Sequence, residues 1–226
     1  QEMSRGLGDV YKRQIYNENF GYFNDPATEF VAVFFMLMSA TNFGLHFLSF
    51  SKRSFKYYLA NDELKLFLSI IFVVVLVSTL TLYMKEGFSV NDSIRYGFFQ
   101  SISIVTTTGY TLEPLSGLGG SIGFLIFVLA FIGACSGSVG GGMKVWRVLL
   151  MLKVGFSNIT KIIHPSAISS VKLNGEKIVS SQIEAVFSFI AIYISFFLLF
   201  MFILIFQNVD FYLSLIHISE PTRHLL

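Results

Sequence analysis

A threonine- and glycine-rich stretch, VTTTGY at Val105–Tyr110, lies between two long apolar segments. The preceding residues, Ser93–Val105, predict a helix of about 13 residues, which rises only ~20 Å and is too short to cross a hydrocarbon core of ~30 Å. A segment that turns back at membrane depth exposes backbone carbonyls, and these can replace the water shell of a cation. We therefore predict a cation-binding filter formed by Thr107, Thr108, Gly109 and Tyr110.

The residues around this stretch support the same chemistry. Gly109 allows a turn that a Cβ would oppose. Asp92 is predicted to cap the re-entrant helix, whose C-terminal end then directs its partial negative charge into the membrane. Hydroxyls of Thr106 and Thr107 would add hard oxygen ligands, which suit alkali cations. An ordinary turn between two helices is the alternative, and the half-length helix between two apolar segments favours the filter.

A second stretch, Gly133–Lys144 (GACSGSVGGGMK), is too rich in glycine for a rigid helix, because each glycine costs up to about 1 kcal/mol relative to alanine. We predict an unwound intramembrane loop that gates the pathway, formed by Gly137, Gly140, Gly141, Gly142 and Lys144. Close helix packing through small residues four apart is one alternative. A phosphate-binding loop is another, but Met143 separates the glycines from the lysine that such a loop requires.

Composition indicates an integral membrane protein. Of the 226 residues, 54% are hydrophobic and only 13% are charged, and the mean hydropathy is +0.67. A net charge of +2 gives no case for nucleic acid. The single cysteine, Cys135, and four histidines without ligand spacing predict no bound metal. We find no nucleophile–base pair or paired intramembrane carboxylates, so we expect neither an enzyme nor a cofactor.

Four apolar segments are expected to position these stretches. They are Thr28–Phe50, Leu64–Tyr83, Ser121–Leu152 with its glycine-rich interruption, and Ile183–Phe206. The predicted fold class is therefore an all-α membrane protein with four membrane segments and one re-entrant pore helix. Between the third and fourth segments, Asn174-Gly175 predicts a tight turn between two short strands, and His164-Pro165 predicts a helix break.

Lysine and arginine set the expected orientation. They are concentrated after the first and third segments, so we assign both connections to the cytoplasm, and the re-entrant helix enters from outside. Residues 1–14 and 214–226 are polar and unlike the rest of the chain. We expect both to be non-native ends of an internal fragment, with natural polar tails as the alternative.

Four motifs together resemble one known family. VTTTGY at Val105–Tyr110, GACSGSVGGGMKVWRVLLMLK at Gly133–Lys153, HPSAISSVKLNGEKI at His164–Ile178 and NDPATEFVAVFFMLMSATNFGLHF at Asn24–Phe47 are similar to the TrkH/KtrB group of potassium transporters. That family has four helix–pore loop–helix repeats around one pathway. The resemblance implies that residues 15–50 form the last helix of a repeat, 64–155 a complete repeat, 156–182 a cytoplasmic connection and 183–213 the first helix of the next repeat.

The resemblance also implies a function and partners. It implies K⁺ uptake across a bacterial inner membrane, with K⁺ as the transported ion. It further implies a cytoplasmic nucleotide-binding regulatory subunit, a homodimer in the full-length protein and contact with membrane lipid. One quarter of a filter cannot surround an ion, so we expect the fragment not to conduct alone. The alternative function is a non-conducting membrane subunit whose glycine-rich segment only packs helices.

Overall fold

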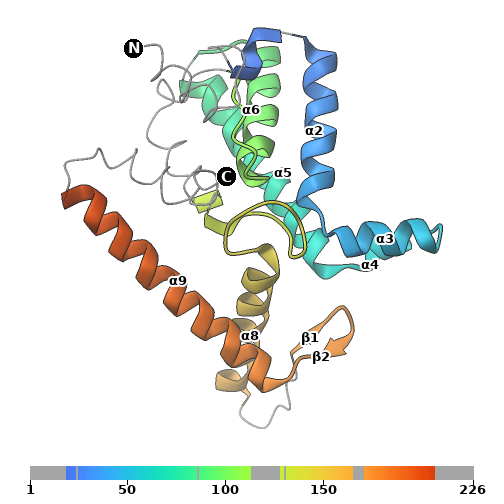
Figure 1. Cartoon of the computed structure of the whole chain (residues 1–226), viewed down its shortest axis with the longest axis vertical. Helices are drawn as coiled ribbons and strands as arrows, with labels where there is room; N and C mark the ends of the chain where they lie inside the picture. The colour runs from blue at the N-terminus through green and yellow to red at the C-terminus, as the bar shows by residue number, and fades with distance from the viewer. Residues whose placement is uncertain are drawn as a thin grey trace, which may run out of the picture.

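A computed structural model of the chain describes residues 19–23, 25–85, 87–112, 128–129, 131–164 and 171–206. The described part is almost entirely helical, which confirms the predicted all-α class (Figure 1). The start of the third apolar segment and both polar ends lie outside these residues. The elements are η1 (Asn19–Phe23), α2 (Pro26–Ala40), α3 (Phe43–Ser51), α4 (Lys56–Ala60), α5 (Asp62–Lys85), α6 (Val90–Val105), α8 (Val145–Ile163), β1 (Lys172–Leu173), β2 (Glu176–Lys177) and α9 (Ser180–Phe206).

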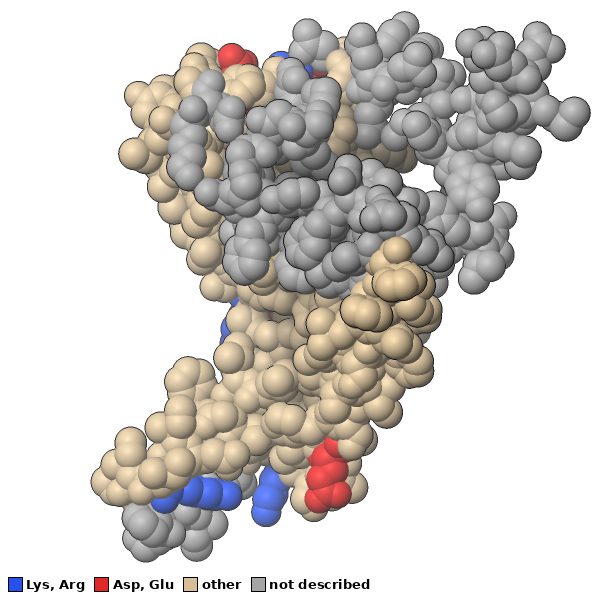
Figure 2. All heavy atoms as spheres, turned by 90° about the vertical axis from the view of Figure 1, so that its left-hand side faces the viewer, with Lys and Arg blue, Asp and Glu red and all other residues tan. Residues whose placement is uncertain are grey.

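Two helices of the described residues are long and apolar enough to cross a bilayer, over Asp62–Met84 in α5 and Ser180–Phe200 in α9. Helix α9 carries apolar side chains around its whole circumference, and most of them are exposed. A helix of this kind is stable only in lipid or against further protein. On the face shown in Figure 2, charged side chains gather near the two ends of the molecule, and few appear on the described surface between them.

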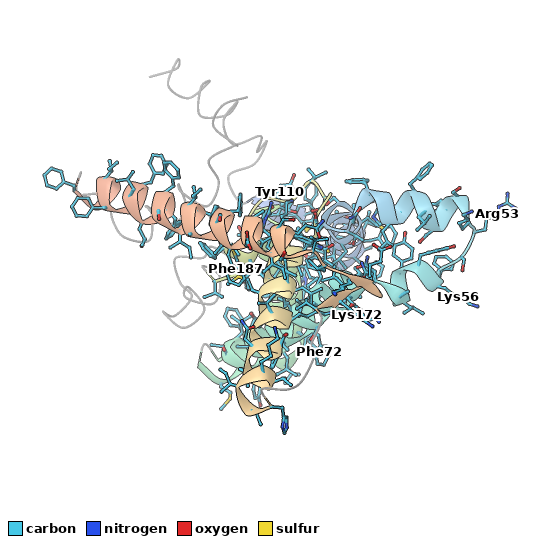
Figure 3. All side chains as sticks on the ribbon, turned by 90° about the horizontal axis from the view of Figure 1, so that it is seen from below. Arg53, Lys56, Phe72, Tyr110, Lys172 and Phe187 are labelled. Carbon is cyan, nitrogen blue, oxygen red and sulfur yellow. The ribbon has the colours of Figure 1, made fainter. Side chains whose placement is uncertain are left out.

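The apolar segment Thr28–Phe50, expected to form one membrane segment, is broken into two helices. Helices α2 and α3 meet at an angle of 95° across Thr41 and Asn42. Asn42 begins the new helix, since its side-chain oxygen accepts a hydrogen bond from the amide of Gly44 at 2.8 Å. The sequence pattern missed the bend because residues on both sides of it are equally apolar. Seen from below, α3 and α4 lead away to one side, with Arg53 and Lys56 at their tip (Figure 3).

The bend is held by a buried histidine. His46 in α3 has its Nε2 atom 2.9 Å from the backbone oxygen of Met38 in α2, and its Nδ1 atom 2.7 Å from the hydroxyl of Tyr58 in α4. A carbonyl can only accept, so Nε2 carries the proton and Nδ1 accepts from the tyrosine. One imidazole therefore fixes three helices relative to one another, which is a structural role and not a metal-binding one.

Helix α2 also has a polar anchor at its start. The carboxylate of Asp25 accepts hydrogen bonds from the amides of Ala27 and Thr28 and from the Thr28 hydroxyl. The bonds from Thr28 and then Ala27 lower the pKa of Asp25, so this cap stays charged at neutral pH. Pro26 follows at the first helical position, where its missing amide costs nothing.

The re-entrant helix α6 is packed between α5 and α2. Half of its residues are buried, including Phe99, Ile102 and Val105. Ser101 in α6 bonds Ser78 in α5 through their hydroxyls at 3.0 Å. Arg95 in α6 pairs with Glu29 in α2, which is only 5% exposed, and one of their two hydrogen bonds measures 2.8 Å. These contacts hold α6 in place among its neighbours. The helix has 16 residues and is about 24 Å long, which is shorter than the hydrocarbon core of ~30 Å.

Close approach of α6 to α5 depends on Gly97. A Cβ at this position would lie 2.6 Å from the hydroxyl and 3.0 Å from the backbone nitrogen of Thr79. We expect Gly97→Ala to reduce the stability of the detergent-solubilised protein by about 1 to 3 kcal/mol, because α6 must move off α5. The midpoint of thermal unfolding measures this.

Gly155→Ala is the matched control for that change, since a Cβ there meets nothing within 4 Å. It is expected to leave stability unchanged or raise it by up to about 1 kcal/mol, the helix propensity difference. Equal effects of the two substitutions would contradict the close packing of α6.

The predicted hairpin is confirmed. Strands β1 and β2 pair antiparallel around Asn174 and Gly175, which both have positive φ angles, +49° and +88°. The side chain of Asn174 accepts from the amide of Asp62 at 2.8 Å, and Asp62 in turn binds Lys153 of α8 at 2.6 Å. The hairpin thus ties the start of α5 to α8. His164 ends α8, which confirms the predicted helix break.

Candidate functional site: the turn after the re-entrant helix and the glycine-rich loop

Helix α6 ends in a tight turn at the predicted filter. The amide of Thr107 donates to the oxygen of Ile104 at 2.9 Å, and the amide of Thr108 donates to the oxygen of Ser103 at 2.8 Å. This pair of bonds is the Schellman arrangement, which places the residue after the cap in the left-handed region. That residue is Thr107, with φ of +56°. Glycine is usual at this position, so a β-branched threonine there is strained by about 1 to 3 kcal/mol.

The predicted filter residues form the turn and the two positions that follow it, and they lie at or near the surface of this chain. Thr107 and Thr108 are half-buried, whereas Gly109 and Tyr110 are exposed. Gly109 has φ of +79°, which agrees with the predicted need for glycine. The ring of Tyr110 packs on Phe20 of η1 at 5.5 Å, so the chain returns toward the level from which α6 set out (Figure 1).

The prediction that Asp92 caps α6 is wrong. The cap is Ser89, whose hydroxyl oxygen accepts from the amide of Asp92 at 3.2 Å. The same hydroxyl donates to the Asp92 carboxylate at 2.7 Å. Asp92 therefore sits in the first turn, three residues after the cap, where the pattern Ser-x-x-Asp resembles a capping box. Its charge still favours the positive end of the helix.

The glycine-rich stretch forms a loop, as predicted, and it is closed at its base. The amides of Met143, Lys144 and Val145 donate to the oxygens of Phe131, Ile132 and Ala134 at 3.0, 2.9 and 3.1 Å. Gly133, Gly137 and Gly142 have positive φ angles between +69° and +82°. Because residues 133–144 are not helical, close helix packing through Gly133, Gly137 and Gly141 is wrong for this segment.

One side of this loop is hydrogen-bonded to the bend between α2 and α3. The amides of Cys135 and Val139 donate to the oxygens of Ala40 and Ser39 at 3.1 and 3.2 Å, and the amide of Phe43 donates to the oxygen of Gly137 at 3.1 Å. The carbonyls of Ser39 and Ala40 are free to accept because α2 ends at Ala40. Cys135 is buried to 1% exposure, as expected of a packing residue.

The loop and the turn after α6 are in direct contact. The amide of Gly141 donates to the hydroxyl oxygen of Thr107 at 2.8 Å. A Cβ added to Gly140 would lie 3.2 Å from the backbone oxygen of Thr106 and 2.5 Å from the side chain of Ala134. The structure therefore brings together two stretches that the sequence separates, with the loop beneath the end of α6 (Figure 1).

Lys144 lies within the base of the loop. It has φ of +77°, and its ammonium group donates to the backbone oxygens of Gly140 and Ser138. These bonds draw the loop's carbonyls toward a positive charge, which stabilises the folded-back conformation. Lys144 thus belongs to the loop, and its predicted part in gating stays a prediction.

Sequence reasoning missed Glu63, which contacts both ends of the loop. Its carboxylate accepts from the amide of Ser136 at 2.5 Å and interacts with the amide of Trp146, and its side chain is buried. The only signal in the sequence is an acidic residue at the start of an apolar helix. Asn42 and His46, which shape the bend, give no signal in the sequence beyond being polar residues near the end of an apolar segment.

The bond between Gly141 and Thr107 can be tested by an isosteric change. Thr107→Val removes the acceptor of this exposed bond, which costs about 0.5 to 1.5 kcal/mol. We expect the midpoint of thermal unfolding of the detergent-solubilised protein to fall accordingly. Thr107→Ser, which keeps the hydroxyl, is the control, and equal midpoints of the two variants would contradict the bond's role.

In the part of the chain that the structure describes, no group of three or more histidine, cysteine, aspartate or glutamate side chains could hold a metal ion. The oxygen atoms near the site are instead backbone carbonyls and threonine hydroxyls. Such hard, uncharged donors suit alkali cations. Fold and site together define an all-α membrane protein with a re-entrant helix and an unwound loop beneath its end.

Comparison with known proteins agrees with this class. Residues 14–218 match the family described as TrkH, cation transport protein, and the chain belongs to that family. It is 35% identical over 196 residues to the Trk system potassium uptake protein TrkH of Escherichia coli strain K12, covering 86% of this chain and 41% of that protein. It is 33% identical over 184 residues to the protein of the same name from Halomonas elongata, covering 81% of this chain and 38% of the relative.

A solved structure is also similar. The crystal structure of the potassium transporter TrkH from Vibrio parahaemolyticus matches with a TM-score of 0.81 and 33% sequence identity, over 86% of this chain and 42% of that one. The chain thus spans about two fifths of the length of the relatives that it matches.

Proposed function

We propose that the protein containing this chain takes up K⁺ across a bacterial inner membrane. Ions would lose water at the backbone oxygens of Thr107, Thr108, Gly109 and Tyr110, and would then pass the loop that includes Gly137–Gly142. The observation that supports the proposal is the contact between Thr107 and Gly141, because a loop that gates the pathway has to meet the end of the re-entrant helix. The similar proteins named as potassium uptake proteins support the choice of ion.

The partners and arrangement follow from the same family. We propose four repeats in the full-length protein, of which residues 64–155 supply one complete repeat, 15–50 the end of the preceding one and 183–213 the start of the next. A cytoplasmic nucleotide-binding regulatory subunit would act on the side of the basic connections, and two copies would form a homodimer in lipid. K⁺ is the cargo, and the protein needs neither a cofactor nor a catalytic residue.

The test is transport by a hybrid protein. Residues 14–218 replace the matching segment of the Escherichia coli TrkH, and the hybrid is expressed in a bacterium that lacks its own K⁺ uptake. We expect growth at low K⁺ and Rb⁺ uptake, both lost in the matched control Gly109→Asp, which adds a charged side chain at a left-handed position. A hybrid that reaches the membrane but does not transport would overturn the proposal in favour of a non-conducting subunit.

A further inference from the structure

Glu63 is a buried carboxylate at the start of α5 that bonds the glycine-rich loop. It is 4% exposed. Its Oε1 atom accepts from the amide of Ser136, near the beginning of the loop, at 2.5 Å. The amide of Trp146, just after the loop ends, interacts with the same carboxylate. One side chain therefore faces both ends of the loop and bonds the first of them.

The carboxylate of Glu63 also interacts with the amide of Trp146, in the first turn of α8. Lys144 precedes this helix and its side chain makes no capping hydrogen bond there. A carboxylate is favoured near a helix N-terminus, because it meets the positive end of the helix dipole. The charge of Glu63 in α5 therefore favours the start of α8 as well as the loop.

Among the described hydrogen bonds between the loop and other elements, the bond to Glu63 is the one with a charged acceptor. The other contacts of the loop with α2, α3 and Thr107 are hydrogen bonds between uncharged groups. A bond to an ionised carboxylate is roughly twice as strong as one between neutral partners. The ammonium group of Lys144 attracts the same carboxylate. Loss of the Glu63 charge would therefore weaken the loop's position more than loss of one neutral bond.

We propose that Glu63 is a positioning residue that holds the glycine-rich loop in its closed position, and that opening of the loop releases the Ser136 amide from this carboxylate. The proposal rests on the proposed gate. It adds that the closed state is set from the start of α5, by a carboxylate that also interacts with the Trp146 amide at the start of α8.

Cys135, the only cysteine of the chain, reports on the loop independently of transport. It adjoins Ser136 and is 1% exposed, so a closed loop protects its thiol. In the hybrid with the relative's own cysteines replaced by serine, membranes are treated with a maleimide. In Glu63→Gln the side chain keeps its shape but loses its charge. We expect Cys135 to react about tenfold faster or more, as loss of a hydrogen bond to a charged group implies.

Two further variants sharpen the test. Glu63→Asp keeps the charge but is one methylene shorter, so it cannot reach the Ser136 amide, and it too should expose Cys135. Asp62→Asn is the matched control, because the adjacent Asp62 binds Lys153 and Asn174 and does not contact the loop. Its Cys135 should stay protected.

Rb⁺ flux without the regulatory subunit separates the two proposals. Faster Cys135 modification with raised flux supports both the positioning role and the gate. Faster modification with unchanged flux supports the positioning role and counts against the gate. Protection of Cys135 in both Glu63 variants, or equal exposure in Asp62→Asn, overturns the role assigned to Glu63 whatever the flux.

Discussion

Deleting Gly137–Gly142 from the hybrid transporter is expected to make Rb⁺ flux independent of its regulator. The deletion removes three hydrogen bonds that hold the loop against the bend between α2 and α3 and against the turn after α6, those of Gly137, Val139 and Gly141. At about 1 kcal/mol each, they favour the closed position by about 3 kcal/mol, or roughly a hundredfold. We therefore expect unregulated flux to rise between about tenfold and a hundredfold.

The rest of the repeat should survive this deletion. The base of the loop is closed by the bonds of Met143, Lys144 and Val145 to the residues preceding it, all of which remain. The deletion thus joins segments that already lie side by side. Tracer flux into proteoliposomes, with and without the regulatory subunit, measures the effect. Combining the deletion with Gly109→Asp is the control, since flux through the pathway must then vanish. Regulation like that of the unchanged hybrid would count against a gate.

Replacing Gly109 by serine is expected to reduce the preference for K⁺ over Na⁺ by about fivefold to thirtyfold. Gly109 has φ of +79°, where a residue with a Cβ is strained by about 1 to 2 kcal/mol. Relief of that strain would rotate the neighbouring peptide groups, and their carbonyls would no longer match the spacing set for K⁺. One to two kcal/mol corresponds to the stated change in discrimination.

Competitive uptake of Rb⁺ and Na⁺ by the hybrid tests this second prediction. Gly87→Ser is a matched control, because Gly87 also has a positive φ, of +68°, and nothing lies within 4 Å of its Cβ position. It carries the same kind of backbone strain outside the pathway and should leave the ion preference as it was. An unchanged preference in Gly109→Ser would remove the support for a carbonyl filter at this turn.

Much of the fold could be predicted because it depends on local pattern. Leu64–Tyr83 and Ile183–Phe206 are apolar over membrane length, and both are helical. Asn174-Gly175 favours positive φ at both residues, and it forms the hairpin turn. The density of glycine over Gly133–Gly142 ruled out a helix, and the segment is a loop. In each case the free energy that decides the conformation comes from neighbouring residues.

Other features could not be predicted because their partners are distant in the sequence. The 95° bend at Asn42 follows an apolar run, and it is stabilised by His46 and by loop amides that bond Ser39 and Ala40. Ser89, and not Asp92, caps α6. Serine and aspartate are both good caps, so the sequence cannot choose between them, and the backbone conformation before Val90 decides.

The sequence alone determined that this chain is an all-α membrane protein, where its re-entrant helix ends and where its glycine-rich loop lies. These properties follow from hydropathy, helix length and the conformational freedom of glycine. Only the tertiary structure decided that Thr107 meets Gly141, that Glu63 bonds the Ser136 amide, and that α2 ends where the loop packs against it. Such contacts arise because amides and carbonyls left free in one segment must find partners in another when water is absent.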